Sequence, residues 1–244
     1  MTSYIGVTGF MHWHELGAAL VSLPESCPRS LMVGVLASSK TLAGATNKYP
    51  NRYPAVGNIE GIFAKLPRTL NLIHYATDER ETLARQLEQL IGLAGPSLNG
   101  FQLNVSWPEP ATFEILRGKT VVLQLNGRAT AELTPEQVAA KLDPYAGLVT
   151  DVLVDLSGGR GLPFDPKRAA ELLQAIDERH PTMGLGVAGG LSVETMGLVV
   201  DLAERFPRLS VDAEGRLRDE QDDLDSDRVG DYVRAAARLF KRVR

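Results

Sequence analysis

The stretch DVLVDLSGGRGLPFDPKRAAELLQAIDERHPTMGLGVAGG, residues 151–190, contains one complete strand–helix–strand unit. Its two apolar runs, 151–157 and 183–190, are nearly continuous, as expected of strands buried on both faces of a parallel sheet. The segment between them, 166–179, has helical spacing and follows Asp165-Pro166, an N-cap residue with proline in the first turn. This unit predicts an α/β protein built on a parallel sheet.

The same rhythm extends in both directions along the chain. Runs rich in β-branched and aliphatic residues recur eight times, at 4–10, 31–38, 71–76, 100–107, 119–126, 151–157, 183–190 and 209–213. Stretches with helical spacing lie between them, at 79–95, 134–148, 166–179 and 192–206, and a last one begins near 226. Eight such units in 244 residues predict a single (β/α)8 TIM barrel, with residues 1–244 forming one domain.

Local signals support the positions of several predicted elements. Thr134 followed by Pro135 predicts a helix start, and Ser192 before Val193-Glu194 predicts another. The last helix carries an apolar stripe made of residues 229, 232, 233, 236, 239, 240 and 243. The segment at about 37–58 is instead rich in small and turn-forming residues, so we expect a long loop over the C-terminal face of the barrel.

Composition excludes several classes of protein. With 30 acidic and 26 basic residues the formal net charge is −4, and basic residues cover no face, so we expect no nucleic-acid partner. Cys27 is the single cysteine, which predicts no intrachain disulfide and a reducing, cytoplasmic environment. No run of residues is apolar for the length of a membrane span, so no membrane partner is expected either. The sequence leaves the oligomeric state open.

A His-x-His motif at His12 and His14 follows the first strand and raises the question of a metal site. Alternate side chains of an extended segment share a face, and metal-dependent hydrolases of the amidohydrolase type begin in this way. Such sites also need histidines from later strands, and the predicted fifth and sixth strands contain none. We therefore predict no metal and no cofactor, and expect His12 and His14 to line the barrel mouth or to cap the first helix.

The carboxyl ends of barrel strands are where the chemistry of this fold is carried out, so residues at these ends are the first candidates. Asp155 ends the sixth strand, where a low-dielectric mouth suits a general acid. Gly189 and Gly190 follow the seventh strand and Gly215 follows the eighth. Because glycines let the backbone approach an anion closely, these three residues predict a phosphate-binding site.

Several short motifs, in this order along the chain, resemble the phosphoribosylanthranilate isomerase family, a barrel of tryptophan biosynthesis. The matching stretches are GVTG at 6–9, QLNV at 102–105, Asp155 with GGRG and FD in the loop 158–165, AGGL at 188–191, and VDAEG at 211–215. The resemblance implies a barrel that binds a phosphorylated sugar derivative and catalyses an Amadori-type aldose–ketose isomerisation without a cofactor.

The resemblance also implies roles for individual residues. Asp155 matches the general acid that protonates the ribose ring oxygen, and the three glycines match the backbone phosphate cradle. Arg52 matches the arginine that faces the anthranilate carboxylate, and three further residues are expected to contact substrate: Gly159, Gly161 and Asp212. Thr8 stands where the family has its catalytic base, so we count it among the catalytic positions.

Thr8 is also the main departure from the family, whose base is a cysteine. A thiol reaches its thiolate near neutral pH, whereas a threonine hydroxyl without a neighbouring base takes up no proton. His12 and Glu15 are the nearest replacements in sequence. The alternatives are therefore another phosphosugar enzyme, either an epimerase or an aldolase, or a non-catalytic phospholigand-binding barrel. Lys40 and Lys48, the lysines expected near the mouth, lie on a loop, which disfavours a Schiff-base aldolase.

Overall fold

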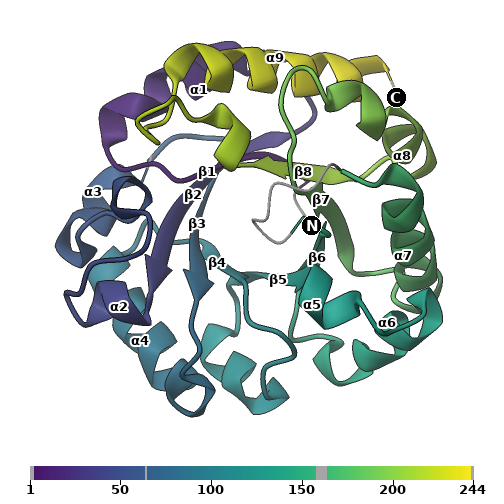
Figure 1. Cartoon of the computed structure of the whole chain (residues 1–244), viewed down its shortest axis with the longest axis horizontal. Coiled ribbons are helices and arrows are strands. Elements are labelled where there is room, and N and C mark those ends of the chain that lie inside the picture. The colour runs from purple at the N-terminus through teal and green to yellow at the C-terminus, as the bar shows by residue number, and fades with distance from the viewer. Residues whose placement is uncertain (1–2, 64, 158–163, 243–244) are drawn as a thin grey trace.

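The computed structural model describes residues 3–63, 65–157 and 164–242. Eight parallel strands pair in sequence order, and β1 closes on β8, so the sheet forms a complete barrel. Figure 1 looks down this barrel and shows the strands as an inner ring with the helices outside it. The strands are β1 (Tyr4–Thr8), β2 (Ser30–Ser38), β3 (Thr69–Ala76), β4 (Gly100–Leu103), β5 (Thr120–Asn126), β6 (Asp151–Asp155), β7 (Gly184–Ala188) and β8 (Ser210–Ala213). The predicted (β/α)8 barrel is confirmed, with each strand within a few residues of its expected position.

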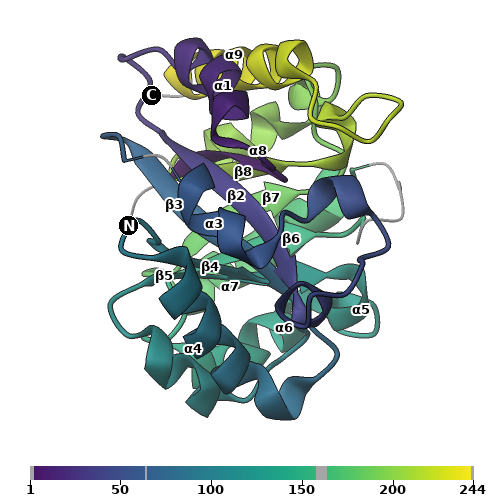
Figure 2. The ribbon, with the colours of Figure 1, turned by 90° about the vertical axis from the view of Figure 1, so that its left-hand side faces the viewer.

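The helices cover the outside of the barrel, as the side view in Figure 2 shows. They are α1 (Leu16–Ser22), α2 (Ser39–Leu42), α3 (Ile59–Ile62), α4 (Leu83–Ala94), α5 (Gly127–Thr130), α6 (Pro135–Lys141), α7 (Pro166–Arg179), α8 (Val200–Arg205) and α9 (Ser226–Arg242). The helix α9 lies beside α1 in Figure 1, and Arg234 Nη1 of α9 donates a 2.6 Å hydrogen bond to Ser22 Oγ of α1. This contact joins the two ends of the chain on one side of the barrel.

Two of the predicted helix starts are confirmed, and one is wrong. Thr134 accepts a hydrogen bond from the backbone N–H of Gln137 in front of α6, and Asp165 accepts one from Arg168 N in front of α7. Ser192 does not begin a helix, because its N–H and hydroxyl are used within the turn after β7 and helical structure starts only at 196. On α9 the predicted apolar stripe is buried as far as Phe240, and Val243 lies outside the described residues.

The segment after β2 consists of α2 and two short 3-10 turns, Pro50–Arg52 and Val56–Asn58. It contacts the chain that follows β8, because Asn51 Nδ2 donates a 3.0 Å hydrogen bond to the backbone oxygen of Gln221. Arg52 reaches the same region and lines the cavity at the barrel mouth. The part of this segment around Asn51 and Arg52 therefore lies against the chain that follows β8.

The barrel interior changes from apolar to polar along its axis. One apolar cluster inside the barrel is made of Tyr4, Met32, Leu70, Leu72, Val122, Leu153 and Ala188, separate from the larger core beneath the helices. Because strand side chains alternate, residues two or four positions further on point into the barrel again. At those positions, nearer the carboxyl ends, the sequence has polar residues such as His74, Gln124 and Asp155. The sequence thus places a polar layer directly above an apolar plug.

Candidate active site

A cavity of about 380 Å³ opens at the carboxyl ends of the strands. It brings together six residues that the sequence predicted for the site: Arg52, Asp155, Gly189, Gly190, Asp212 and Gly215. This volume is within the range of small-molecule sites in proteins. Gly159 and Gly161, also expected to contact substrate, lie outside the described residues. Thr8 is fully buried below the cavity and does not line it.

A polar layer lies at the base of this cavity, and we define it as His74, Gln102, Gln124, Asp155 and Asp212, which line the cavity, together with Thr8 directly beneath them. All six side chains are almost completely buried and are supplied by β1, β3, β4, β5, β6 and β8. Hydrogen bonds run through the layer from one carboxyl group to the other. Gln102 Nε2 lies 3.1 Å from Asp212 Oδ2 and 3.3 Å from Gln124 Oε1, and Gln124 Nε2 donates to Asp155 Oδ2 at 2.8 Å.

Asp155 is held rigidly at the end of β6. In addition to the bond from Gln124, its Oδ1 accepts hydrogen bonds from the backbone N–H of Ser157 at 3.1 Å and from Ser157 Oγ at 2.8 Å. An aspartate that accepts from the residue two positions later forms a compact turn, which fixes the carboxyl group relative to the strand. The side chain therefore has a defined orientation at the edge of the cavity.

Asp212 on β8 is the second carboxyl group of the layer. Burial raises its pKa from 3.8 to about 7, although hydrogen bonds from Gln102 and Thr8 act in the opposite direction. Thr8 Oγ1 donates to both carboxylate oxygens, at 3.0 and 3.1 Å. Gly6 makes room for this arrangement, since a Cβ there would lie 2.6 Å from Asp212 Oδ1. The hydroxyl of Thr8 thus supports a carboxyl group that titrates near neutral pH.

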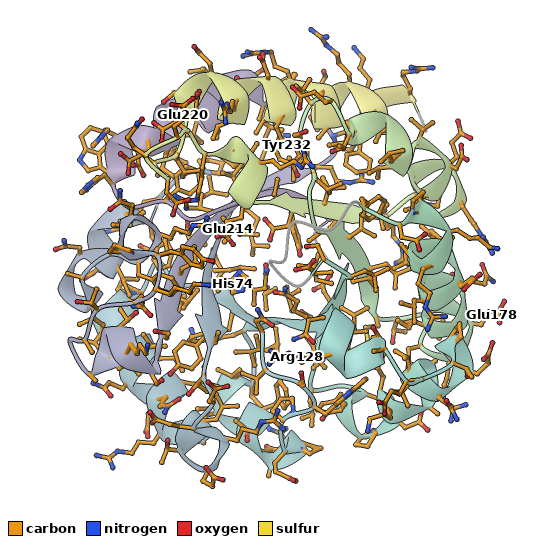
Figure 3. All side chains as sticks on the ribbon, viewed as in Figure 1. His74, Arg128, Glu178, Glu214, Glu220 and Tyr232 are labelled. Carbon is orange, nitrogen blue, oxygen red and sulfur yellow. The ribbon has the colours of Figure 1, made fainter. Side chains whose placement is uncertain are left out.

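His74 on β3 completes the layer. Burial lowers its pKa, and the charges of Glu214 and Asp155 offset this only in part, so the imidazole is neutral at pH 7. Its Nδ1 lies 3.2 Å from Gln102 Nε2. With this amide orientation Nδ1 accepts the hydrogen bond, and the ring proton is assigned to Nε2. Figure 3 shows His74 and Glu214 on the same side of the barrel mouth.

The expected phosphate cradle lies at the ends of β7 and β8. Gly189 and Gly190 both adopt positive φ, at 100° and 70°, and Gly215 begins a short 3-10 turn after β8. Within the described residues, the N–H groups of these three glycines donate to no side chain and to no backbone oxygen outside the regular strands and helices. Arg216, which sequence reasoning did not single out, also lines the cavity. Backbone N–H groups beside a guanidinium suit a phosphate group.

Position 189 requires glycine for two reasons, its positive φ and the close approach of Asp155 and Ser157. A Cβ at this position would lie 2.6 Å from Asp155 Oδ1 and 3.0 Å from Ser157 Oγ. We expect Gly189→Ala to lower the free energy of unfolding by about 2–4 kcal/mol, from left-handed backbone strain and steric overlap together. It should also weaken the binding of inorganic phosphate. Urea unfolding and calorimetric titration measure the two effects.

Gly147 provides a matched control for this substitution. It has a positive φ of 80°, and a Cβ there would meet nothing within 4 Å. Gly147→Ala should therefore show the backbone strain alone, about 1–2 kcal/mol, with phosphate binding unchanged. Equal losses of stability and of phosphate affinity in the two variants would show that contact with Asp155 has no part in the effect.

Arg52 lines the cavity but is already paired. Its Nε and Nη2 donate to Asp222 at 2.8 and 2.6 Å, and its Nη1 donates to Glu214 at 2.9 Å. Burial alone would lower the pKa of Arg52, but these two acidic partners outweigh that effect and raise it. Nearby, the buried Arg218 donates to the backbone oxygens of Gly9 and Asp222 at 3.0 and 2.7 Å. Both arginines thus bind the β8 segment to its neighbours.

The histidine pair after β1 lies away from this site. The rings of His12 and His14 stack with centroids 5.3 Å apart, both side chains are exposed, and neither lines the cavity. Of the two alternatives expected for this pair, the structure shows the second for His12, which is the N-cap residue of the 3-10 turn Trp13–Glu15 that leads into α1. Glu15 Oε2 accepts hydrogen bonds from the N–H groups of Met11 and His12 and organises this turn. In the described part of the chain, no group of three or more His, Cys, Asp and Glu residues is arranged to hold a metal ion.

Of three comparisons with known proteins, the one with solved structures finds matches. No protein-family model matches the sequence, and no curated protein sequence matches it. Among solved structures, phosphoribosyl anthranilate isomerase from Thermus thermophilus matches with a TM-score of 0.65 and 16% identity, over 99% of this chain and 100% of that one. The Thermotoga maritima enzyme matches with a TM-score of 0.63 and 17% identity, over 97% and 98% of the two chains.

A third match is a phosphoribosyl anthranilate isomerase in complex with reduced 1-(o-carboxyphenylamino)-1-deoxyribulose 5-phosphate, at a TM-score of 0.62 and 17% identity, over 97% of this chain and 98% of that one. No described helix of this chain is both long and apolar enough to cross a membrane.

Identities this low establish the fold and not the reaction. The chain is structurally similar over nearly its full length to phosphoribosylanthranilate isomerases.

Proposed function

We propose that this protein binds a phosphorylated sugar derivative in the barrel mouth and catalyses an Amadori-type aldose–ketose isomerisation. The observation that carries the proposal is the pair of buried carboxyl groups, Asp155 and Asp212, which both line the cavity beside the glycines of β7 and β8 and are linked through Gln102 and Gln124. An isomerisation of this kind needs one group that gives a proton and one that takes a proton, both next to a fixed substrate. The phosphate would be held by Gly189, Gly190, Gly215 and Arg216, as a phosphoribosylanthranilate isomerase-like enzyme requires.

Asp155 is proposed as the general acid. In the first step the ring oxygen of an aminoaldose takes a proton from Asp155 while the bond between this oxygen and C1 breaks and the nitrogen lone pair forms a C=N bond, which gives an open-chain protonated imine. The turn that Asp155 forms with Ser157 fixes the donor at the cavity edge. Proton transfer by a well-positioned side chain of this kind accelerates a reaction about 10²–10⁴-fold.

Asp212 is proposed as the base that removes the proton from C2 and leaves an enolamine, which then tautomerises to the ketose. Thr8 stands at the base position of the resembling family, and its hydroxyl donates to Asp212. The base would thus have moved from β1 to the adjacent strand β8. A carboxylate with a pKa of about 7 is a stronger base than an ordinary aspartate and is still ionised in about half of the molecules at neutral pH.

His74 and the cavity lining bear on which reaction the protein catalyses. The proposed Nε2–H of the neutral His74 can donate to a sugar hydroxyl or to the oxygen of the enolamine, which favours chemistry on an open-chain sugar. Among the described residues that line the cavity there is no lysine, so an aldolase that forms a Schiff base finds no support.

The general-acid assignment predicts that Asp155→Asn lowers kcat for phosphoribosylanthranilate by about 10²–10⁴-fold. The amide keeps the shape of the side chain and can still accept from Ser157, so inorganic phosphate should bind as in the wild type. Asp151→Asn is a matched control, because Asp151 is a buried carboxyl group at the opposite end of the same strand. It should leave kcat within a few-fold of wild type.

Three outcomes separate the possible functions. Turnover by the wild type that is lost in Asp155→Asn and kept in Asp151→Asn supports the isomerase. Phosphate binding without turnover would favour a non-catalytic phospholigand-binding barrel. Full activity in Asp155→Asn would remove Asp155 from the mechanism.

A further inference from the structure

A second cavity of about 540 Å³ lies on the same face of the barrel, at the ends of β3, β4 and β5. Its lining comes from the chain after these strands and includes Arg80, Asn104, Asn126 and Arg128. None of the residues proposed for the isomerase reaction lines it. Sequence reasoning assigned this region no function.

The two cavities are neighbours in the barrel. Gln102 and Gln124 belong to the floor of the first cavity, and Asn104 and Asn126 follow them by two positions on the same chain segments. Residues two apart along a strand point to the same side, so the asparagine pair lies one step further out than the glutamine pair. Asn126 Nδ2 donates to Asn104 Oδ1 at 3.0 Å, and in the layer below Gln102 Nε2 donates in the opposite direction, to Gln124 Oε1, at 3.3 Å. On these two chain segments, the lining of the second cavity therefore follows the floor of the first by two residues.

The charges in the second cavity are not neutralised. In the described part of the chain, Arg80 and Arg128 form no salt bridge and no side-chain hydrogen bond, whereas Arg52 in the first cavity is paired with two carboxylates. The acidic residue of this lining is Asp78, so the lining carries a net positive charge. Figure 3 shows Arg128 on the β5 side of the mouth, across from Glu214. Asn104 Nδ2 donates to no described residue and adds a further donor.

We propose that this cavity is an anion subsite, in which Arg80, Arg128 and Asn104 bind a second acidic group of the substrate. The substrate would then carry anions at both ends, with its phosphate at β7 and β8 and a carboxylate or second phosphate above β3–β5. Guanidinium groups without a carboxylate partner are suited to either anion, through charge-assisted hydrogen bonds. This inference rests on the proposed function, because the sugar between the two anions must lie over the polar layer.

The test compares probes that differ in the second anion alone. Reduced 1-(o-carboxyphenylamino)-1-deoxyribulose 5-phosphate carries a phosphate and a carboxylate, and its phenylamino analogue lacks the carboxylate. Ribulose 1,5-bisphosphate and ribulose 5-phosphate form the corresponding pair for a second phosphate. Binding of each probe is measured calorimetrically for the wild type, for the double variant Arg80→Ala/Arg128→Ala, and for Arg216→Ala.

The double variant should bind the two-anion probe about 10–100-fold more weakly and the matching one-anion probe with unchanged affinity. The probe pair that shows this difference identifies the second anion as a carboxylate or as a phosphate. Arg216→Ala should weaken all four probes, because it acts on the shared phosphate. Arg117→Ala is the control, since Arg117 is an exposed arginine paired with Glu114 on the outside of the barrel.

Two results would count against the proposals, and they differ. If the double variant binds every probe as the wild type does, or loses affinity equally for both members of each pair, the anion subsite is excluded while the proposed function stands. If the wild type binds none of the four probes, the proposed function itself fails, and the subsite proposal fails with it.

Discussion

Replacing Asp212 by asparagine should lower kcat by about 10²–10⁴-fold, a loss as large as that expected for Asp155→Asn. Asparagine has nearly the same shape and can still accept a hydrogen bond from Thr8, but it takes up no proton. If Asp212 is the base, the wild-type rate should fall as pH decreases through about 7, because protonation of this carboxyl group removes the acceptor. Measurement of kcat between pH 5 and 9 shows this decrease directly, as the acidic limb of the pH–rate profile.

The variant Thr8→Val separates the base from the residue that supports it. Valine matches threonine in shape but lacks the hydroxyl that donates to Asp212 and lowers its pKa. The acidic limb should therefore move to higher pH, with the rate at high pH largely retained. A limb that stays in place in Thr8→Val, or that moves to lower pH, would contradict the assignment of Asp212 as the base.

The barrel could be predicted because its signals are local. Each strand is a short apolar run, and residues 151–190 contain a strand, a capped helix and a second strand in that order. The alternation of side chains also connects the sequence to the site, since His74 lies two positions after Leu72, which faces the barrel interior. Applied to β3, this alternation places His74 at the barrel mouth, but it does not indicate which residues His74 contacts there.

The partners within the site could not be predicted, because they come from residues far apart in the chain. Arg52 was expected to face a substrate carboxylate, yet Asp222 and Glu214, about 160–170 residues away, pair with it. Likewise, from sequence Thr8 indicated only that the catalytic cysteine of the resembling family is missing. In the structure its hydroxyl donates a hydrogen bond to Asp212. Nothing in the local sequence around position 8 indicates that a carboxyl group from β8 lies there.

Asp212 also has a consequence for stability that can be measured without a substrate. Its pKa is about 7 in the folded protein and close to 3.8 in the unfolded chain, so between these pH values the folded protein holds a proton that the unfolded chain has released. The contribution of this proton to stability is complete below pH 4 and disappears as pH rises through 7. The full difference is about 4 kcal/mol, since one pKa unit corresponds to about 1.4 kcal/mol.

Asp212→Asn should remove this dependence, because the amide is neutral at every pH in the range. Relative to the variant, the wild type is expected to lose about 3 kcal/mol of unfolding free energy between pH 5 and pH 8. Urea unfolding of both proteins at the two pH values gives this difference, in which other groups such as the buried Asp151, whose pKa burial also raises, cancel. A variant that loses stability in parallel with the wild type would mean that Asp212 is ionised in the fold without penalty. If the wild type loses unfolding free energy at high pH and Asp212→Asn does not, the fold is less stable at neutral pH because it keeps a reactive carboxyl group at the barrel mouth.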